Sequence, residues 1–368
     1  MSRETVPFKP YVAELKPYVA QAPVERLRAE LGIDKIHKLA SNEGAFGPTP
    51  GALKAIAEHT PELQRYPDST APELRAKIAA LRGLAADNVV LGNGADELIR
   101  LVAMATLGEG DNGVFPWPSF PTYVAAIAST GAEPRPVDLD GNWQVDLDKL
   151  KSAIYPSTRL VYVANPNNPT GQLIPPADLR AFVEGLPEHV ICVLDEAYAE
   201  FAEGDHEPEG PQLIREGAKN LLVLRTFSKA YGLAGLRIGY GLGAPEIVAG
   251  VDRMRSIFNV NSLAQAAALA ALDDQAEVWR RVEHAKQSRT QIFKLLTLAG
   301  HKPLASRSNF VFAEAAGGNG ADVERRLLRQ GVAVRELSGF GAPGAFRVTV
   351  GDDEANAAFA AALDRLTG

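Results

Sequence analysis

The sequence lacks the residues that several classes of protein need. It has one cysteine, Cys192, among 368 residues, which excludes an internal disulfide framework and a cysteine-rich zinc site. The six histidines are scattered and form no metal-binding pattern, so we expect no metal. No stretch approaches the roughly 18 uninterrupted apolar residues of a membrane span, and the first ten residues carry no apolar secretory core. We therefore expect a cytoplasmic protein with no membrane partner.

The charge balance argues against a nucleic-acid partner. The chain carries 38 Lys and Arg against 45 Asp and Glu, a formal net charge of −7, and it contains no basic run. Its length suits two domains, or one large domain with an appendage, and allows a sizeable core without covalent staples.

Apolar strand-like runs alternate with helical patterns through the first two thirds of the chain. The runs lie at 89–91, 159–164, 190–194, 221–224 and 238–240, and a helical stretch at 95–107 follows the first of them. Nearly continuous apolar strands separated by helices indicate a sheet that is buried on both faces and mainly parallel. In such sheets ligands bind beyond the carboxyl ends of the strands, so chemistry is expected there.

The pattern changes near residue 262. Two helical stretches, 262–272 and 275–298, precede a strand–helix–strand–strand–helix unit that ends near 366. This predicts a large α/β domain and a smaller α+β domain. We assign an N-terminal arm packing with the small domain to 1–46, the large domain to 47–261 and the small domain to 262–368.

Two of the strand ends carry groups that donate hydrogen bonds. Ala95, Asp96 and Glu97 open a helix directly after a strand, and the free backbone amides there suit a phosphate, although Asp96 could simply cap the helix. The loop 165–171 (Asn-Pro-Asn-Asn-Pro-Thr-Gly) is rigid and rich in amides, although a turn with local side-chain hydrogen bonds is an alternative reading.

Two other strand ends carry ionisable groups. Asp195 ends an apolar strand, where a carboxylate is costly unless it meets a cation, and Tyr198 can reach the same place; helix capping is the alternative. Lys229 follows the next strand, is flanked by hydroxyls and precedes Arg237 across a glycine-rich return. This arrangement suits an imine-forming amine beside a phosphate clamp, and an ordinary surface lysine is disfavoured because four strand ends each carry part of one site.

Together these groups match what pyridoxal 5′-phosphate requires. The cofactor needs an amine, a carboxylate for its ring nitrogen, donors for its phenolic oxygen, an aromatic face and a phosphate cup. The sequence supplies them in that order as Lys229, Asp195, Asn168 with Tyr198, Phe120, and Gly94–Glu97 with Thr226, Ser228 and Arg237.

Three strings carry a family resemblance: 165–171, Asp-Glu-Ala-Tyr at 195–198, and Arg-Thr-Phe-Ser-Lys-Ala-Tyr-Gly-Leu-Ala-Gly-Leu-Arg at 225–237. They resemble the fold-type I pyridoxal-phosphate aminotransferases and, among these, the histidinol-phosphate aminotransferase family. Matching motifs run from residue 18 to 350. The resemblance implies transamination between an amino donor and a 2-oxo acid, most simply histidinol phosphate and 2-oxoglutarate, giving imidazole acetol phosphate and glutamate in histidine biosynthesis.

The resemblance also implies roles for individual residues. Lys229 would hold the cofactor as an imine and then move the proton, Asp195 would pair with the ring nitrogen, and Asn168 and Tyr198 would hold the phenolic oxygen. Phe120 would stack on the ring. Tyr66 would reach the phosphate of the neighbouring subunit's cofactor, making a homodimer with shared active sites. The residues implied at the phosphate are Ala95, Asp96, Glu97, Thr226, Ser228 and Arg237.

For the substrate, the resemblance implies an anion site formed by Arg347, Arg335 and Tyr18, next to Asn168. A guanidinium binds either a carboxylate or a phosphate through two parallel hydrogen bonds. Arg335 as a solvated residue at a strand end and Tyr18 as a core residue are the alternatives.

Two segments depart from the family pattern. Ser41–Pro48 (Ser-Asn-Glu-Gly-Ala-Phe-Gly-Pro) differs from the usual Asn-Glu-Asn-Pro, and the Ser119-Phe120 pair resembles aromatic-amino-acid aminotransferases. Phenylalanine or tyrosine is therefore an alternative donor on the same scaffold. A pyridoxal-phosphate decarboxylase of the threonine-phosphate type is less favoured, and a non-catalytic binding protein is disfavoured because the reactive residues are all present.

Overall fold

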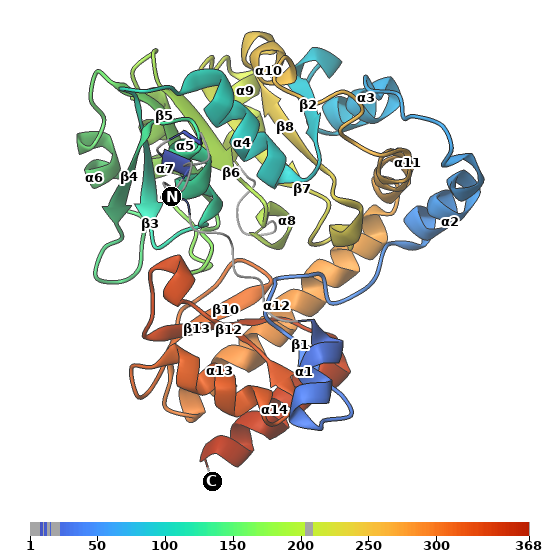
Figure 1. Cartoon of the computed structure of the whole chain (residues 1–368), viewed down its shortest axis with the longest axis vertical. Coiled ribbons are helices and arrows are strands. Elements are labelled where there is room, and N and C mark those ends of the chain that lie inside the picture. The colour runs from blue at the N-terminus through green and yellow to red at the C-terminus, as the bar shows by residue number, and fades with distance from the viewer. Residues whose placement is uncertain (1–7, 10, 13–14, 16–22, 203–208, 368) are drawn as a thin grey trace, which may run out of the picture.

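The computed structural model describes residues 8–9, 11–12, 15, 23–202 and 209–367. Its centre is a seven-stranded sheet in the order β2-β8-β7-β6-β5-β3-β4, drawn in the upper half of Figure 1. Only β8 runs antiparallel to its neighbours, so the prediction of a mainly parallel sheet is confirmed. The strands are β2 (Val89–Gly92), β3 (Asn112–Trp117), β4 (Glu133–Asp138), β5 (Thr158–Ala164), β6 (Ile191–Asp195), β7 (Leu221–Thr226) and β8 (Gly239–Gly243).

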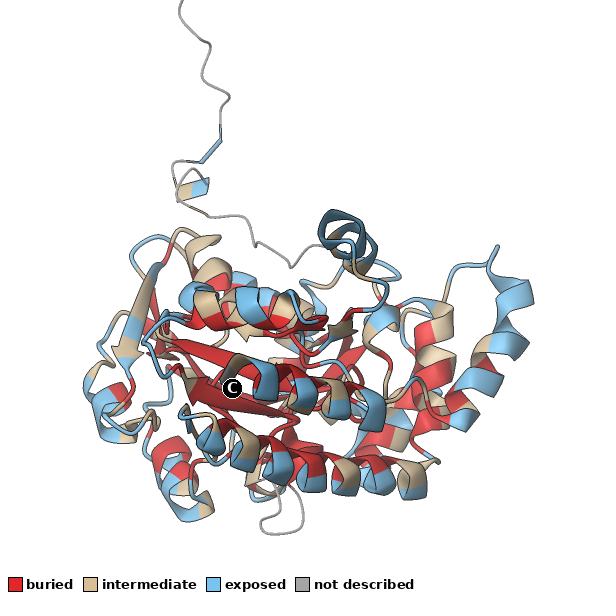
Figure 2. Cartoon of the chain, turned by 90° about the horizontal axis from the view of Figure 1, so that it is seen from below, coloured by how far each residue is buried: buried red, intermediate tan, exposed pale blue. Residues whose placement is uncertain are grey.

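Alternate residues of β2, β3, β5, β6 and β7 enter two separate cores, because side chains along a strand point to opposite faces. In β5, Leu160 and Tyr162 pack with α4 (Ala95–Thr106), α5 (Thr122–Ala128) and α10 (Pro245–Asp252). On the other face, Val161 and Val163 share a core with residues of α3 (Pro72–Leu81), α7 (Pro176–Glu184) and α9 (Glu209–Arg215). Figure 2 shows the buried strands enclosed between helices whose outer faces are exposed.

A second lobe lies below the large sheet in Figure 1. Its antiparallel sheet has the order β12-β13-β10-β9, and a separate parallel pair joins β1 to β11. These strands are β1 (His37–Lys38), β9 (Lys302–Pro303), β10 (Phe310–Glu314), β11 (Val332–Ala333), β12 (Arg335–Glu336) and β13 (Ala345–Thr349). The helices of this lobe are α1 (Val24–Leu31), α12 (Gln275–Leu298), α13 (Gly320–Leu328) and α14 (Asp353–Thr367).

The remaining helices belong to the upper part of the molecule in Figure 1. They are α2 (Pro50–His59), α6 (Leu147–Ser152), α8 (Ala199–Ala202) and α11 (Ser262–Ala271), and α2 projects beyond α11. Helix α11 packs on α2 and α3, although the predicted boundary assigns 262–271 to the small domain. The domain boundaries therefore remain a prediction. Within the described ranges, no helix is long and apolar enough to cross a membrane.

Candidate active site

The candidate site lies at the carboxyl ends of β5, β6 and β7. Asp195 is the last residue of β6 and lies in register with Ala164 of β5 and Leu224 of β7. Its side chain is 6% exposed and accepts hydrogen bonds from the Tyr123 hydroxyl at 2.7 Å and the Ala197 backbone amide at 3.1 Å. Burial raises the pKa of this carboxyl group. Among the described residues no cation forms an ion pair with Asp195, whose partners are a hydroxyl and a backbone amide, so the site holds a buried acid suited to a cationic ligand.

Lys229 follows β7 by three residues and supplies the amine. Its Nζ lies 3.4 Å from the backbone oxygen of Ser41, to which it donates a hydrogen bond. Burial, together with the positive charges of Arg347 and Arg237, lowers the pKa of Lys229 to about 8. Near neutral pH a much larger fraction of this amine is uncharged than in an exposed lysine, which makes it a better nucleophile.

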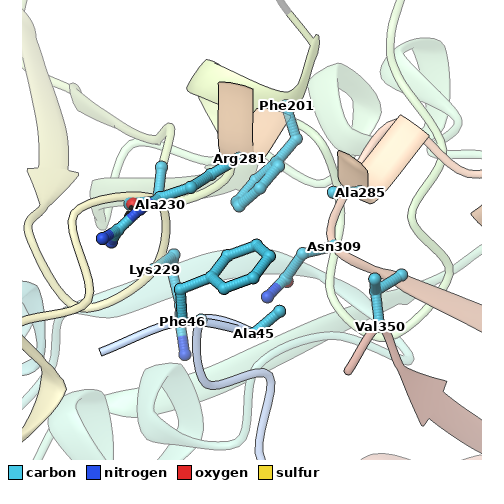
Figure 3. A pocket seen from close by; sticks show the side chains of 10 residues that line it. Ala45, Phe46, Phe201, Lys229, Ala230, Arg281, Ala285, Asn309 and Val350 are labelled. Atoms are coloured by element: carbon cyan, nitrogen blue, oxygen red, sulfur yellow. Dashed lines mark hydrogen bonds between the residues drawn. The ribbon is translucent and has the colours of Figure 1, made fainter. Parts of the chain in front are cut away.

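A small pocket behind Lys229 shows how the lysine is held in place. The loop before α2 passes so close that a Cβ atom on Gly44 would lie 2.5 Å from the Lys229 carbonyl oxygen, which requires glycine there. Phe46 packs edge-on against His284 of α12, with ring centroids 5.0 Å apart, and it also lines the pocket. Figure 3 shows the Lys229 amine pointing away from the rings of Phe46 and Phe201. The pocket therefore fixes the stem of the lysine and leaves its reactive end outside.

A cluster of donors lies beside Lys229. Thr226 Oγ1 donates to Ser228 Oγ at 3.0 Å, and Arg237 Nη1 donates to the same oxygen at 3.5 Å. Gly94, with φ of +81°, caps α4, and a Cβ atom on it would lie 2.5 Å from Arg237 Nη2. The glycine thus lets the guanidinium approach the start of the helix. Hydroxyls, a guanidinium and unpaired helix amides in one place form a cup for a phosphate dianion.

Asp96 and Glu97 use their side chains to hold the start of α4. Asp96 accepts from Thr122 Oγ1 at 2.7 Å and from Arg100 Nε at 3.2 Å. Glu97 accepts from the Asn93 backbone amide at 2.6 Å. Gly94, and not Asp96, occupies the N-cap position. Because their side chains are used in this way, we expect Asp96 and Glu97 to contact a phosphate through their backbone amides.

The three asparagines after β5 divide into two groups. Asn165 Oδ1 accepts from the Ile174 amide at 2.8 Å, and Asn167 accepts from Ser119 Oγ at 2.9 Å, so these two fix the loop itself. Asn168 instead accepts a hydrogen bond from Arg347 of the second lobe. The interpretation as a turn with local side-chain hydrogen bonds fits Asn165 and Asn167. Asn168 instead lies where the two lobes are in contact.

Two arginines lie side by side on the second lobe. Arg335 of β12 and Arg347 of β13 are direct partners in the antiparallel register, so their side chains share one face of the sheet. Their guanidinium carbons lie 5.8 Å and 5.2 Å from the ring centroid of Phe340. Arg347 is buried and donates to the Ala40 carbonyl at 2.9 Å. Like charges placed directly opposite destabilise a sheet, and an anionic ligand between them relieves that cost.

The comparisons with known proteins agree with this geometry. Residues 34–363 match the model of the family described as aminotransferase class I and II. A histidinol-phosphate aminotransferase of Anaeromyxobacter sp. (strain Fw109-5) is 41% identical over 359 residues, covering 98% of each chain. Histidinol-phosphate aminotransferase 1 of Cupriavidus pinatubonensis (strain JMP 134 / LMG 1197) is 43% identical over 365 residues, covering 98% of this chain and 96% of that one. This chain belongs to the histidinol-phosphate aminotransferase family, within class I and II.

A solved structure extends the likeness to three dimensions. The histidinol-phosphate aminotransferase from Sinorhizobium meliloti in complex with pyridoxal-5′-phosphate superposes with a TM-score of 0.89 at 31% identity, covering 99% of this chain and 98% of that one. The predictions of the family, of the fold class and of an aminotransferase are confirmed. The family is pyridoxal-phosphate-dependent, and the residues of this aminotransferase fit that cofactor: a buried acid without a cation, an amine of lowered pKa and an anion cup.

The other predicted site residues of the aminotransferase lie as follows. The Tyr198 hydroxyl accepts a hydrogen bond from Asn42 Nδ2 at 2.9 Å, and its ring centroid is 5.8 Å from Lys229 Nζ. Phe120 packs edge-on against Tyr123 with ring centroids 5.8 Å apart. Tyr66 is 82% exposed and stacks on Phe258 at 4.6 Å. Tyr18 lies outside the described residues.

Sequence reasoning missed two parts of this site. Tyr123 donates to Asp195 and stacks on Tyr162 at 4.7 Å, yet in the sequence it resembles any apolar helix residue. The pair Asn42 and Thr349 lies 307 residues apart in sequence, and no local pattern joins its members. The unusual Ser41–Pro48 segment was the one available signal for Asn42.

Proposed function

We propose that this aminotransferase uses pyridoxal 5′-phosphate to transfer the amino group of histidinol phosphate to 2-oxoglutarate, giving imidazole acetol phosphate and glutamate for histidine biosynthesis in the cytoplasm. The observation that carries the choice of donor is the register pair Arg335 and Arg347, with both guanidiniums against Phe340. Two adjacent positive charges suit a phosphate dianion better than the single carboxylate of an ordinary amino acid.

The residues around β6 and β7 would hold the cofactor. When bound, pyridoxal phosphate supplies an electron sink that stabilises negative charge on the carbon bearing the amino group. Asp195 would hold the proton on the ring nitrogen, since a buried carboxylate gains most from a cation placed beside it. Thr226, Ser228, Arg237 and the amides of Ala95–Glu97 would bind the phosphate, and Asn168 and Tyr198 would hold the phenolic oxygen.

Lys229 would act twice. Its amine would hold the cofactor covalently until the amino donor takes its place. The same amine, whose pKa is lowered to about 8, would take the proton from the donor carbon and release it at C4′ of the cofactor. An amine with a pKa near the working pH can both accept and release a proton, which this shift requires.

The proposal includes a homodimer with shared sites. Exposed apolar side chains gather beside Tyr66: Phe258 stacks on it, and Ile257 next to Phe258 is 81% exposed. A contiguous apolar patch on a single chain marks an interaction surface. A second copy of the chain would cover this patch and bring Tyr66 to the phosphate of its partner's cofactor.

The donor is tested by steady-state kinetics with 2-oxoglutarate as acceptor. We expect kcat/KM for histidinol phosphate to exceed that for phenylalanine and for unphosphorylated histidinol. Arg335→Gln is expected to lower the value for histidinol phosphate roughly 10- to 100-fold, while histidinol is affected much less, because a charge-assisted hydrogen bond to the phosphate is lost.

Arg325→Gln is the matched control, since Arg325 is an exposed arginine of α13 that pairs with Asp322 at 2.6 Å. It should leave both donors unaffected. A higher kcat/KM for phenylalanine than for histidinol phosphate would overturn the proposed donor.

A further inference from the structure

Asn42 is buried between the two lobes and is held on several sides. It is 1% exposed and has φ of 54°, a left-handed conformation that asparagine tolerates better than most residues. Its backbone amide donates to Thr349 Oγ1 at 3.0 Å, and its carbonyl oxygen accepts from Asn309 Nδ2 at 3.2 Å. The position of its side chain is therefore fixed independently of any ligand.

The direction of each hydrogen bond in this cluster follows from the chemistry of the groups. A backbone N–H can only donate, so Thr349 Oγ1 must accept from Asn42. Thr349 is buried, and its single hydroxyl proton goes to Asn42 Oδ1 at 2.9 Å. The side-chain amide of Asn42 is thereby oriented, because turning it over would leave the buried hydroxyl proton of Thr349 without an acceptor.

The orientation of this amide determines what Tyr198 can do. With Oδ1 toward Thr349, Asn42 presents Nδ2 to the Tyr198 hydroxyl at 2.9 Å, so the Tyr198 oxygen accepts. Within the described part of the chain, the hydroxyl has no other hydrogen-bond partner, and the side chain is buried. The Tyr198 proton is thus left to donate to a ligand.

We propose that Asn42 and Thr349 are positioning residues that direct the Tyr198 hydroxyl proton to the phenolic oxygen of the bound cofactor. This inference rests on the proposed function. The hydroxyl of Thr349 in β13 orients the side-chain amide of Asn42, which lies in the loop before α2. This amide then donates to the Tyr198 oxygen beside the large sheet, so the Tyr198 proton points elsewhere. The cofactor would accept from Tyr198 and never compete with Asn42 for the same proton.

A spectroscopic pKa reports this hydrogen bond. A donor at the phenolic oxygen stabilises the deprotonated, more negative form of the bound cofactor, so it lowers the pKa that governs the visible absorbance. The charged groups facing Tyr198 and Lys229 are Arg347, Asp195, Arg237 and Glu43. None of them is altered in the Thr349 variants below, so their contributions stay constant there.

The experiment is a pH titration of the visible absorbance of the holoenzyme. Thr349→Val keeps the shape of the side chain and removes the hydroxyl that orients Asn42. We expect the absorbance pKa to rise by roughly half a pH unit or more, as for the loss of one hydrogen bond. Thr349→Ser keeps the hydroxyl and should keep the wild-type pKa.

A double variant separates this effect from a general structural one. In a Tyr198→Phe background, Thr349→Val should cause no further shift, because the proton that it redirects is absent. Thr158→Val is the matched control: Thr158 is also buried, accepts from the Tyr155 amide at 2.9 Å and donates to Asn112 Oδ1 at 2.7 Å, at the opposite end of β5. It should lower thermal stability and leave the absorbance pKa unchanged.

If Thr349→Val does not fold, Asn42→Asp is the alternative variant for the same titration. Aspartate tolerates the left-handed backbone, and its carboxylate can only accept a hydrogen bond from Tyr198. This variant should raise the absorbance pKa more when the Tyr198 hydroxyl is present than in the Tyr198→Phe background, because the charge of the added carboxylate acts in both backgrounds. An unchanged pKa in the variant that folds, or an equal rise with and without the Tyr198 hydroxyl, would overturn the inference. Failure of the wild-type protein to take up pyridoxal phosphate would instead overturn the proposed function, so the two failures are distinct.

Discussion

At the scale of single residues, burial acts in opposite directions on the two central groups. It raises the pKa of the Asp195 carboxyl group and lowers the pKa of the Lys229 amine to about 8. The hydroxyl of Tyr123 counters the first effect by donating to Asp195 at 2.7 Å, which favours the anion. One site thus holds an acid whose charged form is disfavoured by burial and favoured by its hydrogen bonds, and an amine that loses its charge easily.

The lowered pKa of Lys229 predicts how the apoenzyme takes up its cofactor. Only the neutral amine attacks the aldehyde, so the rate of uptake should rise with pH and level off above about 8. The measurement is the growth of visible absorbance after pyridoxal phosphate is added to apoenzyme between pH 6.5 and 9.5. N-α-acetyllysine is the control: its side-chain amine has a pKa of roughly 10.4, so its rate should still be rising at pH 9.5. A rate for the protein that follows the control would contradict the lowered pKa.

At the scale of elements, the sequence predicted the three strands that carry the site but missed two of the other four strands of the large sheet. β5, β6 and β7 are unbroken apolar runs and were predicted within a few residues. β3 and β4 were missed, because both contain proline, which removes a ladder hydrogen bond and argues against a strand: Pro116 lies in β3, an inner strand, and Pro134 and Pro136 lie in β4, at the edge. The run at 332–335 divides between two sheets, with β11 pairing β1 and β12 pairing β13, which no local pattern shows.

The sequence likewise predicted one part of the site and missed another. The convergence of Asn168, Asp195 and Lys229 was predictable because parallel strands end at one edge of a sheet. The hydrogen bonds of Asn42 with Thr349 and of Tyr123 with Asp195 depend on tertiary contacts between distant segments. Such partners become visible only when the two lobes, or a helix and a strand, are placed in space.

A buried ion pair links β6 and β7 directly behind the site. Arg225 is 0% exposed and Glu196 is 1% exposed, and Arg225 Nε donates to Glu196 Oε2 at 2.8 Å. Glu196→Gln keeps the shape and removes one charge, leaving the arginine with Glu200 at 3.4 Å. We expect a loss of about 3 kcal/mol in the free energy of unfolding, because a buried charge loses its main partner.

Urea denaturation of the purified variant measures this loss. The matched control is Glu216→Gln, which removes an exposed partner of Arg180 and should cost no more than about 1 kcal/mol. Equal small effects of the two substitutions would show that the buried pair contributes little.

At the scale of the whole molecule, the site is assembled from separate bodies. Arg347 of the second lobe donates to Asn168 at the large sheet, and Asn42 joins Thr349 to Tyr198. Tyr66 lies 82% exposed beside an apolar surface, as expected of a residue that completes a neighbour's site. In the proposed homodimer, movement of one lobe or separation of the subunits would therefore disturb substrate binding and cofactor binding together.

Shared sites predict complementation between two inactive proteins. Lys229→Ala lacks the reactive amine, and Tyr66→Ala should bind the cofactor phosphate weakly. In a mixed dimer, one site receives Lys229 from one subunit and Tyr66 from the other and is intact. Mixing the two variants equally, with subunit exchange, should restore about a quarter of wild-type transamination at limiting cofactor. Activity that stays at the sum of the two separate variants would contradict shared sites.

The most direct test of the account is a single turnover of the holoenzyme with histidinol phosphate and no 2-oxo acid. Product is counted by mass spectrometry after rapid mixing. The wild-type protein should form about one imidazole acetol phosphate per subunit and lose the visible absorbance of its cofactor, whereas Lys229→Ala should form none. No product from the wild-type protein, or equal product from the variant, would contradict the central role of the amine beside Asp195.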